Sequence, residues 1–177
     1  SSKNILDILE SQNFGKVDIF SIDIDGTDYW ILNKLERDFS NIVILEYNSV
    51  FGENLEVTVP DIEGFSRNNY HHSNLCYGMS LKAAINLMEG KNFYFLGTNN
   101  LKNNAFFISK KFSKDSYFPN LKIESIKDAT TSFLSESRDQ NGNLNYIKGS
   151  GKINQIKDCD VVDLRNKGHS LKKIKEF

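Results

Sequence analysis

Three aspartates follow the first apolar strand that the sequence predicts. They lie in the stretch 22–28, IDIDGTD, which begins where the β-branched run 17–23 ends. In α/β sheets, ligands bind at the carboxyl ends of the strands. Asp25 and Asp28 have an equally good structural explanation, because the first suits a turn before glycine and the second suits a helix cap. Asp23 ends a buried strand, where its charge needs a partner. We therefore expect Asp23 to have a functional role.

A second polar group follows the next apolar strand, 42–46, and consists of Glu46, Tyr47 and Asn48. If the two strands are adjacent and parallel, they lie about 4.8 Å apart. Asp23 and Glu46 then face one crevice, with Asn48 nearby. These three residues offer oxygen ligands suited to Mg²⁺. The alternative is that the same groups hydrogen-bond a substrate hydroxyl or a loop backbone, and both explanations stay open.

Two adjacent histidines, His71 and His72, lie in segment 49–78, which is rich in Asn, Gly and Ser and has no clear period. A loop of this length in a compact domain is usually functional or mobile. One of the histidines can act as a general base near pH 7. The alternative is that both are solvent-exposed polar residues.

The spacing of apolar residues predicts an α/β fold that positions these groups. Strand 17–23, a helix carrying Ile31, Leu32, Leu35 and Phe39 on one face, and strand 42–46 form the smallest unit of a parallel sheet. Further elements are a helix at 4–12, a helix capped by Ser80, an antiparallel pair at 93–96 and 105–108, and a turn at Asn141-Gly142.

Composition restricts the possible partners. The 177 residues fit one domain, and 39% hydrophobic content allows a sizeable core. A formal net charge of −1 argues against nucleic acid as a partner. No apolar run approaches the roughly 20 residues of a membrane helix. Cys76 and Cys159 lie far apart with no metal-ligand spacing, so we expect buried thiols in a reducing, cytoplasmic compartment.

Four stretches together resemble the FkbM-like S-adenosylmethionine-dependent methyltransferases. They are VDIFSIDIDGTDYWIL at 17–32, NIVILEYNSVFG at 41–52, VTVP at 57–60, and the long stretch 70–109 that begins YHHSNLCYGMS. The segment ESRDQNGNLNYIKG at 136–149 is similar to the C-terminal extension of one bacterial branch. The spacing of DIDG-x-DYW and EYN is more specific than either motif alone.

The resemblance implies part of a Rossmann-like methyltransferase sheet with flanking helices. Residues 17–23 would be the fourth strand and 42–46 the fifth. Residues 93–97 and 104–108 would be the last two, one of them antiparallel. Residues 1–112 then form the C-terminal half of a methyltransferase-like domain, and 113–177 form a small extension packed on it. The implied reaction is O-methyl transfer to a sugar, a glycan or another small hydroxylated substrate.

The resemblance implies that the methionine part of the cofactor lies near the end of the fourth strand, which carries Asp23. Together with the residue chemistry above, we expect cofactor binding by Asp23 and Asp25 and catalysis by Asp23 and His71. The residues expected to bind the substrate are Glu46, Tyr47, Asn48 and His72. This sequence departs from the family because no Gly-rich loop and no three earlier strands precede residue 17. We therefore expect a fragment or a truncated paralogue, in which residues 1–177 do not bind S-adenosylmethionine strongly.

In the family the fourth strand is flanked by the first and the fifth. Without the first, strand 17–23 would leave an apolar edge unpaired, and such edges recruit another strand. We expect a second copy of the chain, an upstream half or another partner, or the chain's own tail to cover it.

Two other functions remain open. The stretch 23–27, DIDGT, matches the haloacid-dehalogenase-like phosphatases, in which Asp23 would attack phosphorus and Asp25 would act as the acid. No clear downstream series of Ser/Thr, Lys and acidic residues supports it. The other alternative is a non-catalytic domain retained for binding or assembly.

Overall fold

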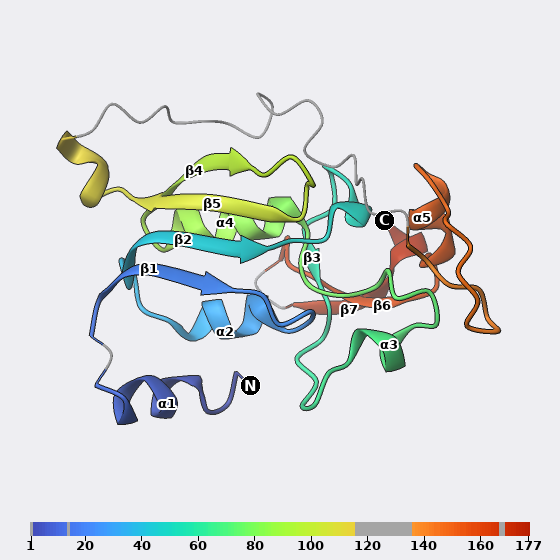
Figure 1. The fold of residues 1–177 in the computed structure, drawn as a ribbon, viewed down its shortest axis with the longest axis horizontal. Helices are drawn as coiled ribbons and strands as arrows, with labels where there is room; N and C mark the ends of the chain where they lie inside the picture. The colour runs from blue at the N-terminus through green and yellow to red at the C-terminus, as the bar shows by residue number, and fades with distance from the viewer. Residues whose placement is uncertain (1, 14, 116–135, 167–168) are drawn as a thin grey trace.

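A computed structural model describes residues 2–13, 15–115, 136–166 and 169–177, which form a mixed α/β fold (Figure 1). A four-stranded sheet has the order β1-β2-β5-β4, and a three-stranded sheet has the order β3-β6-β7. In chain order the elements are α1 (Ile5–Ser11), β1 (Val17–Ile22), α2 (Asp28–Lys34), β2 (Ser40–Glu46), β3 (Val57–Thr58), α3 (Arg67–Tyr70), α4 (Leu81–Gly90), β4 (Phe93–Thr98), β5 (Asn104–Ser109), α5 (Gly151–Gln155), β6 (Asp160–Asp163) and β7 (Ser170–Lys173).

The first two strands are adjacent and parallel, as predicted. Their register pairs Val17 with Ser40 and Ile22 with Leu45, so both strands end at the same edge of the sheet. The predicted antiparallel pair is also confirmed, since β4 pairs with β5, and β5 is antiparallel to β2 as well. The sheet is therefore mixed.

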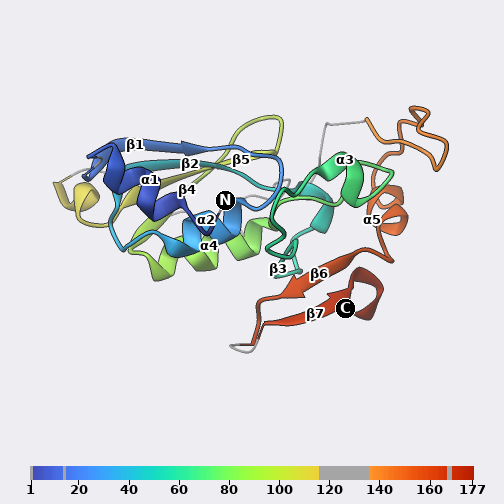
Figure 2. The same ribbon diagram turned by 90° about the horizontal axis from the view of Figure 1, so that it is seen from below.

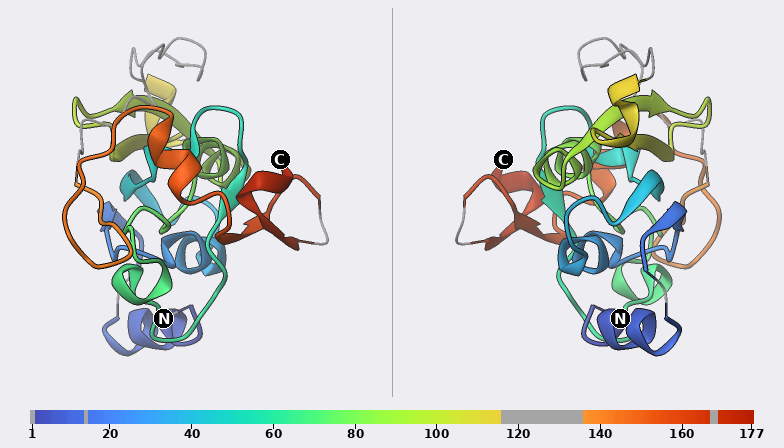
Figure 3. Two further views of the ribbon diagram at one scale, coloured as in Figure 1. Left: turned by 90° about the vertical axis from the view of Figure 1, so that its right-hand side faces the viewer. Right: turned by 90° about the vertical axis from the view of Figure 1, so that its left-hand side faces the viewer.

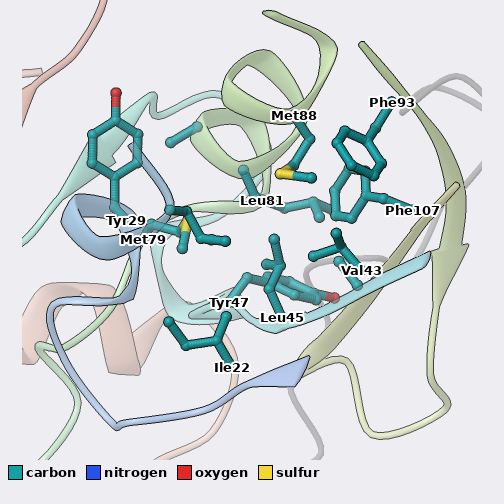
Figure 4. Packing of buried hydrophobic residues seen from close by; sticks show 14 of the residues in the cluster. Ile22, Tyr29, Val43, Leu45, Tyr47, Met79, Leu81, Met88, Phe93 and Phe107 are labelled. Carbon is teal, nitrogen blue, oxygen red and sulfur yellow. The ribbon is translucent and has the colours of Figure 1, made fainter. Parts of the chain in front are cut away.

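The main core lies between this sheet and the helices. Figure 2 shows α2 and α4 on one face of the sheet, with α1 beside α2. In Figure 4, Val43, Leu45 and Phe107 of the sheet face Leu81 and Met88 of α4, and all five are buried. Alternate residues of β2 supply this face because side chains along a strand alternate between its two faces.

Helix α2 is shorter than the sequence predicted. The expected stripe included Leu35 and Phe39, but α2 ends at Lys34, and Leu35 has an extended backbone with ψ 152°. Asp38, in the connection to β2, has a left-handed backbone with φ +56°. Leu35 is buried in the main core, and the partly buried Phe39 packs against it. The prediction that these two residues contact the core is therefore confirmed, whereas the prediction that they belong to the helix is wrong.

The C-terminal segment supplies two of the three strands of the second sheet, β6 and β7. β6 pairs with β3, joining it to the segment that follows β2, and Figure 3 shows the β6–β7 pair at the side of the molecule. Cys76 and Cys159 lie together in a second core there, where a hydrogen bond between the thiols and burial raise the pKa of Cys76. The predicted boundary at 112/113 adjoins 116–135, which lie outside the described residues.

Strand β1 forms one edge of the four-stranded sheet. Among the described residues no strand pairs with its free side, and Asp18, Ile19 and Ser21 are exposed. The described part of the tail does not cover this edge, since β6 and β7 belong to the other sheet. Coverage by a second copy or by a partner stays a prediction. No helix in the described ranges has the length and apolar character needed to cross a bilayer.

Replacing Ser80 should destabilise the fold, because its buried Oγ accepts hydrogen bonds from the backbone N–H groups of Ala83 and Val57, both at 3.2 Å. Ser80→Ala removes the cap of α4 and leaves the N–H of Val57 without a partner, so we expect a loss of about 2 kcal/mol in urea unfolding. Ser11→Ala, at an exposed hydroxyl, is the control and should cost less than about 0.5 kcal/mol. Equal losses would contradict the capping role.

Candidate functional site

Three carboxylates meet where β1 and β2 end. Oxygens of Asp23, Asp25 and Glu46 all lie within 4.8 Å of one another. The parallel register explains this meeting, because Asp23 follows Ile22 and Glu46 follows Leu45, and those two residues are partners. Both strands point towards the same loops in Figure 1. The sequence predicted that Asp23 and Glu46 share one crevice, and the structure brings them together there.

The turn after β1 is held by Asp28. Its carboxylate accepts hydrogen bonds from the N–H groups of Ile24 at 3.0 Å and Gly26 at 3.1 Å. Asp28 is 1% exposed, and burial raises its pKa. A side chain at Gly26 would collide with the ring of Phe65. Asp28 thus shapes the turn that presents Asp23. It does not cap α2 as predicted, because the N-cap position is Thr27 and no side chain caps the helix.

Glu46 is the buried member of the cluster. Its residue is 7% exposed, and its Oε2 has no hydrogen-bond partner. Burial, followed by the negative charges of Asp23, Asp25 and Asp28, raises its pKa to about 8, against a smaller lowering by Arg67. A carboxyl group in this setting can exchange a proton near neutral pH or bind a cation.

Arg67 borders the cluster and was not singled out from sequence. Its guanidinium donates to Asp25 and, at 3.2 Å, to the carbonyl oxygen of Asn74, and it lies 4.1 Å from the ring centre of Tyr77. A signal existed, since Arg67 is the only Lys or Arg in segment 49–78. Its contacts hold α3 against the turn after β1.

An open depression of about 500 Å³ adjoins the cluster at Asp25 and Arg67. Its lining is largely polar and consists of Ile24, Asp25, Phe65, Ser66, Arg67, Asn68, Asn74 and Glu136. A more apolar cavity of about 380 Å³ lies at the opposite end of β1, between Leu6, Val17 and Phe39. The polar depression is the better candidate of these two for a ligand, because it adjoins the carboxylates and the apolar cavity does not.

The side chain of Asn48 is hydrogen-bonded to the loop backbone. Its amide nitrogen donates to the carbonyl oxygens of Leu75 at 2.8 Å and Tyr77 at 3.0 Å, and its Oδ1 accepts from the N–H of Val50 at 3.0 Å. These bonds correspond to the loop-backbone alternative considered from sequence. We therefore leave Asn48 out of the candidate metal site, and Asp25 takes its place there.

Tyr47 and the two histidines lie apart from the cluster. Tyr47 is fully buried in the main core, where burial raises its pKa to about 12. His71 Nδ1 lies 2.7 Å from Ser73 Oγ, and burial lowers the pKa of His71. His72 lines a second depression of about 580 Å³, which shares Asn68 and Asn74 with the first. The described contacts do not join either imidazole to Asp23, so their predicted roles gain no support.

No family model, curated protein sequence or solved structure matches this chain. The case for a function therefore depends on the site and on the sequence motifs.

Proposed function

We propose that this chain is the acceptor-binding part of an S-adenosylmethionine-dependent O-methyltransferase acting on a sugar or another small hydroxylated compound. The observation that carries the proposal is the meeting of Asp23 and Glu46 at the ends of two parallel strands, beside an open polar depression. The arrangement of β1, β2, β4 and β5 supports the resemblance, because the first two are parallel and one of the last two is antiparallel.

The exposed carboxylate of Asp23 is suited to the acceptor hydroxyl. It accepts the hydroxyl hydrogen bond and takes the proton as the oxygen gains its methyl group. Glu46 orients the acceptor from the buried side of the crevice. Arg67, held between Asp25 and Tyr77, keeps the turn in place at the rim of the depression.

The described residues fit the cofactor only in part. S-adenosylmethionine supplies the methyl group when bound, and the carboxylates of Asp23 and Asp25 can accept hydrogen bonds from its ammonium group. No Gly-rich turn after a strand is present in the described ranges to hold the adenosine. We therefore expect calorimetry to show no micromolar binding of S-adenosylmethionine to the 177-residue chain.

Methyl transfer tests the proposal directly. The assay follows labelled methyl groups from S-adenosylmethionine to a panel of monosaccharides and nucleotide sugars. It uses both the 177-residue chain and the product of the whole reading frame that encodes it. We expect transfer by the latter, and a loss of about 100-fold or more in kcat for Asp23→Asn, because the proton acceptor is removed.

The control is Asp18→Asn, an exposed aspartate on β1 that bonds to Asn41 and lies at the other end of the strand. It should retain full activity, and circular dichroism should show an unchanged fold for both variants. Undiminished turnover in Asp23→Asn would overturn the role of Asp23. Absence of transfer to every acceptor would overturn the proposed reaction in favour of the binding or assembly alternative.

A phosphatase is the second candidate, because Asp23 and Asp25 of the DxDGT stretch lie together with Glu46 and beside Arg67. Carboxylates that hold Mg²⁺ and a nearby guanidinium suit a phosphoryl group. Hydrolysis of p-nitrophenyl phosphate in the presence of Mg²⁺, lost in Asp23→Asn, would favour this candidate over methyl transfer.

A further inference from the structure

We propose that Asp23, Asp25 and Glu46 form a binding site for one hard divalent cation of the Mg²⁺, Mn²⁺ and Ca²⁺ class. This inference rests on the same site as the proposed function. It goes further by naming an inorganic ligand and by replacing the amide of Asn48 with the carboxylate of Asp25 in the ligand set.

The spacing of the oxygens suits such an ion. The candidate ligand atoms of all three residues lie within 4.8 Å of one another. Opposite oxygens around Ca²⁺ are about 5 Å apart, and those around Mg²⁺ about 4 Å. The spacing as it stands therefore matches Ca²⁺, and the exposed side chains of Asp23 and Asp25 would have to move closer for Mg²⁺. Carboxylate oxygens are the donors that cations of this class prefer.

The orphaned oxygen of Glu46 independently points to a ligand. Glu46 is 93% buried, faces the two aspartates, and has an Oε2 without a hydrogen-bond partner. A buried acceptor in that state has lost its water without gaining a partner, which destabilises the fold. A cation held by the three carboxylates would compensate the buried charge of Glu46 and give its carboxylate a partner.

The local charge favours a dication. The negative charges of three aspartates, Asp23, Asp25 and Asp28, act on Glu46, and Arg67 is the cation that acts on it. Two carboxylate charges at this separation repel each other, and a dication between them removes that repulsion. Asp28 is committed to the backbone of the turn, which leaves the other three as ligands.

The contact between Arg67 and Asp25 leaves room for the ion. Arg67 binds Oδ1 of Asp25, and 55% of that side chain is exposed. The carboxylate can therefore bind Arg67 on one side and a cation on the other, as carboxylates often bridge two partners. Water completes the coordination shell on the open side.

Calorimetry with MgCl₂, MnCl₂ and CaCl₂, after removal of metals, tests the site without any methyl donor or acceptor. We expect saturable binding of one cation per chain and a rise in Tm on addition of the tightest one. Glu46→Gln and Asp23→Asn should each weaken binding at least tenfold, and Asp18→Asn should leave it unchanged. Circular dichroism checks the fold of each variant, and Asp25→Asn, at an exposed position, replaces Glu46→Gln if that variant does not fold.

Absence of saturable binding by the wild-type chain would overturn the site, as would equal affinity of the wild type and folded Glu46→Gln or Asp25→Asn. Failure of the proposed function is a separate outcome, because cation binding without methyl transfer retains the site and rejects the reaction. Methyl transfer that is indifferent to chelator, together with no cation binding, would retain the reaction and reject the cation site.

Discussion

The wild-type chain should lose stability as the pH rises from about 5 to about 9 in chelator-containing buffer, and Glu46→Gln should not share that loss. The pKa of Glu46 is raised from 4.5 to about 8 in the folded chain. Below pH 4.5, the pKa of Glu46 in the unfolded chain, the folded and the unfolded chain both hold the proton. The contribution of Glu46 to the unfolding free energy is then fully present. Between pH 4.5 and about 8 the unfolded chain releases a proton that the folded chain retains. The unfolding free energy therefore falls as the pH rises.

The shift in the pKa of Glu46 corresponds to a loss of up to about 5 kcal/mol, complete just above pH 8. Glutamine has the shape of glutamate without its charge, so the difference in unfolding free energy between wild type and Glu46→Gln isolates this one group. Urea unfolding at pH 4.5, 6, 7.5 and 9 measures it. A difference that stays constant across this range would show that Glu46 is not in the buried acidic setting described here.

Asn48→Ala should be among the most destabilising single substitutions outside the apolar cores. It removes three hydrogen bonds and leaves the carbonyl oxygens of Leu75 and Tyr77 and the N–H of Val50 without that partner. Asn48 is 1% exposed, and each buried orphaned group costs about 1–3 kcal/mol. We expect a loss of at least about 3 kcal/mol in urea unfolding.

Asn41→Ala is the matched control for this substitution. Its side chain makes one exposed hydrogen bond, to Asp18, so its loss should cost less than about 1 kcal/mol. A cost for Asn48→Ala no larger than for Asn41→Ala would mean that Asn48 does not hold the loop. The hypothesis that Asn48 binds the cation together with Asp23 and Glu46 would then be favoured.

Strands β1 and β2 and the start of α4 could be predicted from the sequence, because each depends on residue types within a few neighbouring positions. The β-branched runs gave β1 and β2, and the position of Ser80 before an apolar stripe gave the start of α4. The ends of β1 and β2 then placed Asp23 and Glu46 together, since parallel neighbours end at one edge. This reasoning needed only the assumption that the two strands are adjacent.

The remaining features depend on contacts between distant residues. Arg67 reaches Asp25 across 42 positions, and Cys76 meets Cys159 in a core that no periodicity marks. β3 is only two residues long and pairs with β6 more than a hundred positions away, so its sequence carries no strand pattern. The amide of Asn48 was assigned to a ligand because its backbone partners in the following loop are not visible in sequence.

Diffraction from crystals soaked in MnCl₂ tests the central claim most directly, namely that the carboxylates at the ends of β1 and β2 form a cation site. We predict one anomalous peak bounded by Asp23, Asp25 and Glu46, with oxygens of all three at about 2.0–2.6 Å from the ion. A cluster without such a peak, in crystals where neighbouring molecules leave the depression open, would contradict the claim.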